Sequence, residues 1–453
     1  MQAGSDAILC LRPVEKRGLP LSTLHDVFRK FRLRLNTPLP EGSAAGPALR
    51  AATVLCREMG DPFENELERS EKFDDGMTGE FLWLDEDIPG TIREVKWEAG
   101  LGGGDIYLQI ARRFDIAINN LRDRAKDNAK VAAFLLHGAP MFLMCLLGPI
   151  FFVAGGFFDG SVVVVEPLGQ PCFMLMDETD QREQEIARLL YAVEQGLDEL
   201  KSVSRSRPSV DFLPGLPRIY SSYVLFTQPE VGNLTFHRRL SKKSQCLLFY
   251  ATLSHPPPTS PSSTPIQSSV VVKLVNKRYG EDVHRRLASR GFAPILYGYS
   301  RLDGAPTAYV MEYLGSDWMS LFEFERGVGA GIFKDAVSSK DTQAALKNAI
   351  RTTLDEILAF MAKEDIVHGD LRPNNIMMQV DEETKPVLSQ AVGAAANLKA
   401  IDFDWAGKAG QVFYPELRNE DIESWPACVG SSIDAGHDRR LVDSWWPAFL
   451  VAR

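Results

Sequence analysis

The chain has 453 residues, of which 45% are hydrophobic and 24% charged, and at this length an ordinary globular composition predicts two domains. The net charge of −10 excludes a surface that is basic overall, so any site for a polyanion such as nucleic acid has to be local. The six cysteines include no Cys-x-x-Cys pair, which favours reduced thiols in an intracellular protein of the cytoplasm or nucleus over a disulfide framework.

The first stretch that suggests chemistry is GTIREVKWEAGLGGGDIYLQIARRF (90–114), which predicts a strand, a glycine-rich turn and a helix. Glu94 and Lys96 share one face of that strand because strand side chains alternate with a period of two. With an aspartate nearby, such a pair can hold a divalent metal ion and position a water beside a phosphodiester. A solvated strand face is the alternative interpretation, since so short a motif often arises by chance.

The aspartate of this trio has three candidates. Asp75 begins the stretch DDGMTGEFLWL, which we expect to form a strand that pairs with the first one. Asp85 and Asp87 lie in the turn between them. The glycines after the strand do not fit the spacing of a dinucleotide-binding turn, so we exclude that interpretation.

Residues 60–200 resemble the PD-(D/E)xK nuclease-like fold. The resemblance depends on EVKWEAGLGGGD and on the apolar PMFLMCLLGP that follows. It implies Asp75, Glu94, Lys96 and, on the following helix, Gln109 as site residues. Nucleic acid is the partner that such a site implies for the N-terminal part of the chain.

The uncharged stretch APMFLMCLLGPIFFVAGGFF (139–158) is long enough to cross a bilayer as a helix. Prolines and glycines divide it into short pieces, and the strand-like SVVVVEP follows at once. We therefore expect buried strands joined by tight turns instead of a membrane span.

Two polar segments after residue 200 indicate where one domain ends and where a sheet of the next domain is interrupted. A helix is predicted over 182–201 by apolar residues at helical spacing, and a linker over 206–217 by the Ser, Arg and Pro that follow. The Pro/Ser-rich segment 254–269 lies between the strand-like runs CLLFYATL and SVVVKLV. It is therefore expected to be a long loop inside a sheet.

The stretch IVHGDLRPNNIMM places His368, Asp370 and Asn375 in the spacing H-x-D-x₄-N. Apolar residues recur every three or four positions over 346–361, so a helix leads into it, and NIMMQV and LKAID read as two strands before Asp402. This order of residues is typical of phosphoryl transfer, in which one Asp orients a hydroxyl while an Asn and a second Asp hold magnesium. Solvated carboxylates on a loop are the alternative.

Residues 218–453 resemble the protein-kinase-like superfamily, with HGDLRPNN as the catalytic loop and IDFDWAG in the place of Asp-Phe-Gly. The resemblance implies ATP and Mg²⁺ as cofactors. It implies Asp370 as the catalytic base and Asn375 and Asp402 as metal ligands. Arg372 takes the place of the lysine that contacts the transferred phosphate.

The upstream half of the same template also has candidates. Lys273, in SSVVVKLV, matches the strand lysine that pairs with ATP phosphates, and its acidic partner is expected to be Glu281, with Asp282 as the alternative. TAYVMEYLGSDW resembles the strand and hinge that hold adenine, near Glu312 and Leu314.

Several features depart from the kinase pattern. The first hairpin of this region has no G-x-G-x-x-G, His-Gly-Asp replaces His-Arg-Asp, and Asp404 replaces the glycine of Asp-Phe-Gly. His-Gly-Asp and the acid at position 404 resemble features of the aminoglycoside and choline kinase branch. The phosphate acceptor could therefore be a small hydroxyl compound instead of a protein. Loss of activity is a further alternative. Asp438, in GHDRR, is a candidate to anchor the catalytic loop from below.

The sequence thus predicts an α+β protein in which an N-terminal α/β nuclease-like domain (1–205) precedes a two-lobed protein-kinase-like domain (218–453), as in crinkler-type and related fungal fusions. The lobes are expected at 218–313 and 314–453. The expected function is ATP-dependent transfer of a phosphoryl group to a hydroxyl, on a protein or on a small compound. The alternatives are a catalytically silent scaffold and a metal-dependent nuclease regulated by the kinase-like domain.

Overall fold

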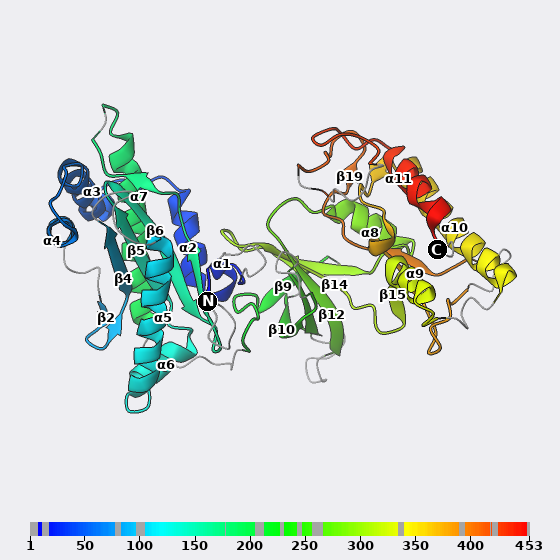
Figure 1. Ribbon diagram of the computed structural model, residues 1–453, viewed down its shortest axis with the longest axis horizontal. Helices are drawn as coiled ribbons and strands as arrows, with labels where there is room; N and C mark the ends of the chain where they lie inside the picture. Colours follow the sequence, from blue (N-terminus) through cyan, green and yellow to red (C-terminus); the bar gives the residue numbers. More distant parts are fainter. Residues whose placement is uncertain are drawn as a thin grey trace. The chain divides into compact units, whose positions relative to one another are not determined.

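Figure 1 shows the computed structural model of the chain, which divides into two compact units. The first comprises Met1–Tyr223, Asn233–Thr252 and Ser300–Thr307, and the second comprises Val224–Gly232, Leu253–Tyr299 and Ala308–Arg453. The structure describes residues 8–10, 18–77, 83–96, 105–176, 178–203, 213–226, 231–241, 247–255, 266–333, 339–388, 395–416, 418 and 425–450. The glycine-rich turn, most of the expected linker and most of the Pro/Ser-rich segment lie outside these ranges.

The first unit is built on a mixed six-stranded sheet with the order β1-β7-β6-β5-β4, in which β8 also pairs with β6. β4 runs parallel to β5 and β1 parallel to β7, whereas β6 is antiparallel to both of its long neighbours. β2 and β3 form a separate hairpin. The strands are β1 (Ile8–Leu9), β2 (Trp83–Asp85), β3 (Ile88–Pro89), β4 (Thr91–Lys96), β5 (Met141–Leu147), β6 (Ile150–Phe158), β7 (Val163–Pro167) and β8 (Cys172–Phe173).

Helices cover both faces of this sheet, as two neighbouring glycines of β6 show. An added Cβ on Gly155 would lie 2.6 Å from Leu21 and 2.7 Å from Phe28, whereas one on Gly156 would lie 2.9 Å from Phe114. Since successive strand residues face opposite sides, the unit has three layers. Its helices are α1 (Leu21–Leu24), α2 (Asp26–Leu35), α3 (Gly46–Glu58), α4 (Glu66–Gly76), α5 (Ile106–Arg124), α6 (Ala129–Leu136) and α7 (Gln181–Val203), with a 3₁₀ turn at Ser43–Ala45.

The apolar stretch 139–158 forms the centre of the sheet. β5 and β6 pair along their whole length, from Met141 opposite Gly156 to Leu147 opposite Ile150. Nearly all of β5 is buried between the two helical layers, which explains its lack of charge. Within the described ranges, no helix has the length and apolar character needed to cross a membrane.

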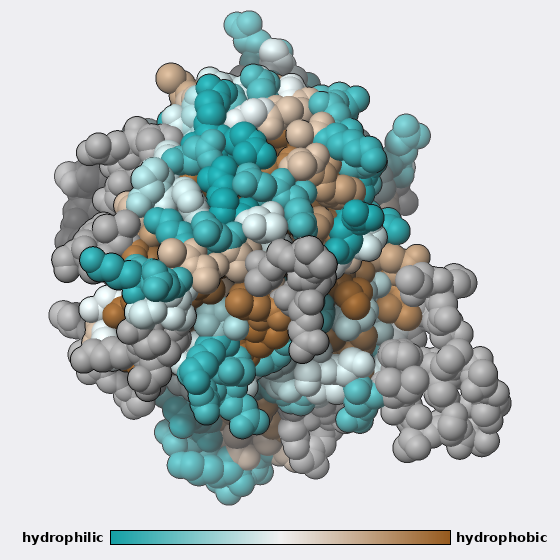
Figure 2. Space-filling view, turned by 90° about the vertical axis from the view of Figure 1, so that its right-hand side faces the viewer, coloured by the Kyte–Doolittle hydropathy of each residue, from teal (hydrophilic) through white to brown (hydrophobic). Residues whose placement is uncertain are grey.

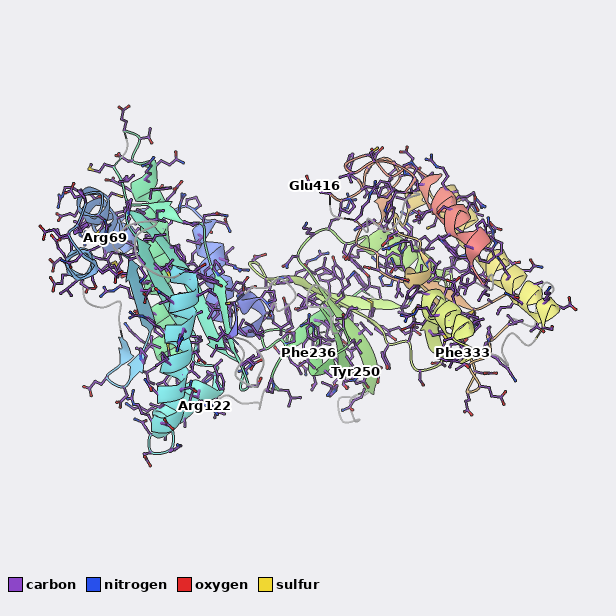
Figure 3. All side chains as sticks on the ribbon, in the orientation of Figure 1. Arg69, Arg122, Phe236, Tyr250, Phe333 and Glu416 are labelled. Atoms are coloured by element: carbon purple, nitrogen blue, oxygen red, sulfur yellow. The ribbon has the colours of Figure 1, made fainter. Side chains whose placement is uncertain are left out.

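The stretch around Asp75 differs from expectation, because it forms helix α4 and not a strand. The helix begins where the Asn65 side chain accepts a hydrogen bond from the backbone N–H of Glu68. Its inner face buries Arg69 completely, with the guanidinium 4.4 Å from the Phe63 ring (Figure 3). A buried arginine interrupts the apolar pattern by which an amphipathic helix is recognised.

The chain from 222 to 312 forms a closed sheet with the strand order β10-β11-β12-β14-β13-β9. The strands are β9 (Ser222–Leu225), β10 (Val231–Arg239), β11 (Leu248–His255), β12 (Ile266–Val275), β13 (Leu296–Ser300) and β14 (Thr307–Glu312). Helix α8 (Glu281–Ser289) follows β12. β11 ends at His255 and β12 begins at Ile266, so both ends of the Pro/Ser-rich segment expected as a loop (254–269) are strand, and its remaining residues lie outside the described ranges.

The rest of the second unit is largely helical. Its elements are β15 (Trp318–Ser320), α9 (Leu321–Gly329), α10 (Lys340–Lys363), β16 (Ile366–Val367), a 3₁₀ turn (Pro373–Asn375), β17 (Ile376–Gln379), β18 (Leu398–Ala400), β19 (Gly407–Lys408), α11 (His437–Trp445) and a second 3₁₀ turn (Trp446–Ala448). The predicted helix and the two predicted strands correspond to α10 and to the antiparallel pair β17 and β18. On the face in Figure 2, hydrophobic residues gather near the middle, with hydrophilic residues above and below.

Candidate active site

The loop after α10 and β16 is held from below by one carboxylate. Asp438, in the first turn of α11, accepts hydrogen bonds from the backbone N–H of His368 at 2.7 Å and of Gly369 at 2.9 Å. Burial raises the pKa of Asp438 to about 6, although both hydrogen bonds act to lower it. The anchoring role expected for Asp438 is thus seen in the contacts.

Gly369 occupies a position that disfavours any other residue. Its φ is +83°, in the left-handed region, where a side chain is strained. An added Cβ would also lie 2.8 Å from Ile433 and 3.2 Å from Trp405. The left-handed backbone and the close neighbours at this position therefore explain why a glycine precedes Asp370.

Asp370 is held by three hydrogen bonds to its carboxylate. Arg372 donates from Nε to Oδ1 and from a terminal nitrogen to Oδ2 at 2.7 Å, and Asn375 donates to Oδ2 at 2.9 Å. Burial raises the pKa of Asp370, against the effect of the Arg372 ion pair. A carboxylate offers about four lone-pair sites. One therefore remains on Oδ1.

His368 connects this loop to the segment that carries Asp402. Its Nδ1 accepts from the backbone N–H of Asp370, so the proton lies on Nε2, which donates to the carbonyl of Ile401 at 3.0 Å. Burial lowers the pKa of His368 to about 4, so the ring is neutral at physiological pH. Phe403 packs against it at 5.0 Å between ring centroids and stacks on His284 at 4.3 Å.

Lys273 links strand β12 to the segment that carries Asp402 and Asp404. Its Nζ lies 2.5 Å from Oδ1 of Asp402 and 2.5 Å from Oδ1 of Asp404. Burial acts to lower the pKa of Lys273, but attraction to Asp402 and Asp404 outweighs it and raises the pKa. Asp402 has a φ of +70°, a strained conformation for a residue other than glycine.

The expected partner of Lys273 does not have this role in the structure. Glu281 is the first residue of α8, while both ion pairs of Lys273 go to the aspartates of the DFD segment. Glu312 ends β14, where its carboxylate accepts from Lys399 at 2.8 Å and from the backbone N–H of Ile295 at 2.9 Å. Leu314 follows β14 at a partly exposed position.

The oxygen atoms of this site suit magnesium. Mg²⁺ prefers oxygen ligands and is usually held by one or two carboxylates together with substrate phosphates. Asp402 and Asp404 supply two carboxylates, and the ammonium of Lys273 already lies between them as a cation. Asn375 uses its side-chain nitrogen on Asp370, which leaves its side-chain oxygen for a metal. In the described part of the chain, no group of three or more His, Cys, Asp and Glu is suited to hold a metal.

The N-terminal candidates are only partly brought together. Lys96 Nζ lies 3.8 Å from Glu94, as the shared strand face predicts, but Glu94 also pairs with Arg113 of α5. Gln109 is one turn earlier than Arg113 on the same face of that helix. Asp75 is exposed on α4. The nuclease-like interpretation stays a prediction.

One cluster was not predicted from the sequence. Trp405, Tyr414 and Trp425 gather beside the loop that carries Asp370, with Arg372 and Arg418 over their rings. The aromatic residues follow no helical or strand period in the sequence. The only available signal was their concentration after Asp402.

No protein-family model and no curated protein matches this sequence. Among solved structures, a Cydia pomonella granulovirus kinase, PK-1, is similar with a TM-score of 0.31 and 16% identity over 48% of this chain and 68% of the other. Vaccinia related kinase 3 is similar with a TM-score of 0.29 and 16% identity over 52% and 69%. Scores this low do not establish a shared fold, so the proposal below is based on the contacts within the site.

Proposed function

We propose that the second unit is an ATP-dependent phosphotransferase that moves a phosphoryl group to a hydroxyl, more specifically to one on a protein. The observation that carries the proposal is the convergence of four residues from three separate segments: Lys273 from β12, Asp370 and Asn375 from one loop, and Asp402 from the segment after β18. Asp402 pairs with Lys273 from β12, and Asn375 bonds Asp370 within the loop. These residues match the set that phosphoryl transfer requires, in the expected chain order.

The contacts of each site residue suggest a separate role in phosphoryl transfer. Asp370 Oδ1 has a lone pair to accept the hydrogen bond of an acceptor hydroxyl, and its raised pKa favours proton uptake as the reaction proceeds. Arg372, beside it, can turn its guanidinium toward phosphate oxygens. Lys273 provides a positive charge for the nucleotide phosphates. Asp402, Asp404 and Asn375 would hold magnesium, which neutralises phosphate charge when Mg·ATP is bound.

Other features support Asp370 as the base. Asp438 fixes the backbone immediately before Asp370, and Asn375 fixes the carboxylate itself. A positioned general base typically contributes about 10²- to 10⁴-fold in rate. This degree of positioning would be unnecessary for a solvated loop carboxylate.

Two alternatives concern the same unit. An acceptor that is a small hydroxyl compound is supported by the glycine before Asp370 and by the acid at position 404, which resemble the aminoglycoside and choline kinase branch. A silent scaffold is supported by the engagement of both oxygens of Asp370 and by the absence of a G-x-G-x-x-G from the sequence of the first hairpin.

The test is transfer of radiolabel from ATP with magnesium by the full-length chain, offered a generic protein mixture or a panel of small alcohols and aminoglycosides. We expect Asp370→Asn to lower transfer by about 10²- to 10⁴-fold and Asp402→Asn to abolish nucleotide-dependent transfer. Asp443→Asn, an exposed ion-pair residue on α11, is the matched control. Equal inertness of all three and the wild type, with ATP still bound, would establish the scaffold.

A further inference from the structure

Three aromatic rings form a cluster next to the proposed catalytic loop. The centroid of Trp405 lies 5.6 Å from that of Trp425 and 6.3 Å from that of Tyr414, and the last two are 5.9 Å apart. Val367, immediately before the loop, belongs to the same apolar cluster. The three rings therefore pack against the residue that precedes the proposed catalytic loop.

Two guanidinium groups share the ring of Trp425. Arg372 lies 5.4 Å and Arg418 lies 5.2 Å from its centroid. Arg372 is also the residue that pairs with Asp370. The second cation, Arg418, is thus separated from the reacting carboxylate by little more than an indole ring and the Arg372 side chain.

Arg418 has no carboxylate partner among the residues that the structure describes. It donates from one terminal nitrogen to the carbonyl of Ala427 at 2.7 Å and lies 5.5 Å from the ring of Tyr414. With respect to the described residues, its other terminal nitrogen and Nε keep their N–H groups for another acceptor. The side chain is half-buried and held by two rings and a carbonyl, so little conformational entropy would be lost when it binds.

Tyr414 gives an independent indication of a missing polar group. The residue is 2% exposed, and its hydroxyl has no hydrogen-bond partner within the described ranges. Buried hydroxyls are normally hydrogen-bonded. Burial raises the pKa of Tyr414, the negative charges of Asp438 and Asp370 add to the rise, and the positive charges of Arg418 and Arg440 oppose it.

We infer that Arg418, Trp425 and Tyr414 form an anion subsite that selects acceptors carrying an acidic group, specifically peptides with an acidic side chain near the phosphorylated Ser or Thr. The inference rests on the proposed phosphotransferase function and names its substrate class. Both guanidiniums lie close to one ring, and an extended residue spans about 3.3–3.6 Å, so the acidic side chain should be within about three positions of the hydroxyl. A carboxylate there pairs with the free N–H groups of Arg418.

The experiment uses the full-length chain and two fluorescent peptides that are identical except that Glu residues flanking one Ser in the first are Gln in the second. Fluorescence polarisation measures binding, and radiolabel from ATP measures transfer to the same peptides. We expect the Glu peptide to bind the wild type about tenfold more tightly. Arg418→Ala should abolish that preference, and Arg418→Glu should reverse it, because like charges repel, so that the Gln peptide binds more tightly.

Arg326→Ala is the matched control, because Arg326 also lies over an aromatic ring, that of Phe322, in the same unit. Equal affinity of the wild type for both peptides, or an unchanged preference in Arg418→Ala, would overturn the subsite. A preference in binding without transfer to any peptide would support the subsite and refute the phosphotransferase proposal. Failure of the anion subsite and failure of the phosphotransferase proposal therefore give different results in this experiment.

Discussion

Substitution of Asp438 by Ala should loosen the catalytic loop without disturbing the rest of α11. The change leaves the backbone N–H groups of His368 and Gly369 buried without their acceptor. Each buried unsatisfied donor costs about 1–3 kcal/mol, so the two together should lower the free energy of local opening by about 2–6 kcal/mol. Release of the buried charge offsets part of this loss, since burial has raised the pKa of Asp438 to about 6.

Hydrogen exchange measured on the full chain reports this change at the residues concerned. The amide protons of His368 and Gly369 should exchange about 10- to 10⁴-fold faster in Asp438→Ala, following the free-energy loss above. Asp443→Ala is the control, because the exposed ion pair of Asp443 with Arg351 should contribute less than about 1 kcal/mol. Unchanged exchange at both amides in Asp438→Ala would show that the carboxylate does not hold the loop.

Three further results are expected. Gly369→Ala should destabilise the loop by about 1–2 kcal/mol, because φ is +83° there, and should reduce transfer more than ATP binding measured by fluorescence. Lys273→Met should weaken Mg·ATP binding in calorimetry, since it removes the ammonium that lies between two carboxylates. Burial lowers the pKa values of His284 and His368 to about 4, below the ordinary 6.5, so the unfolded chain binds more protons between these limits. Denaturant titrations should therefore show stability rising as pH increases from about 4 to 6.5, and Asp438, whose raised pKa acts in the opposite direction, should offset only part of the rise.

Helices and strands of the second unit could be predicted because the spacing of their own apolar residues indicates the type of element. Apolar residues at helical spacing predicted α10, and the two short apolar runs after the loop predicted β17 and β18, which pair antiparallel in the structure. The contact of His368 with the Asp402 segment follows from that pairing. The H-x-D-x₄-N motif and Asp402, separated in the sequence, therefore do lie close together in the structure.

Helix α4 could not be predicted in the same way. Of its residues, Arg69, Phe73 and Gly76 face the interior, so the buried face contains one large apolar residue and no periodic apolar stripe. The acids in its first turn and the Asn65 cap are the features that favour the helix. The apolar run that follows favours a strand, and for this reason the sequence pattern places Asp75 at the start of one.

The partner of Lys273 depends on tertiary contacts that no local pattern encodes. The order of the chain points to Glu281, but the third residue of the DFD segment places a second carboxylate within 2.5 Å of the ammonium. Two carboxylates around one ammonium leave a net negative charge, which a divalent cation would neutralise more fully than a lysine does. Asp404, a departure from the glycine of the kinase pattern, is thus explained as part of the charge balance of the site. The acidic third position is therefore a reason to expect cation binding and not a sign of lost function.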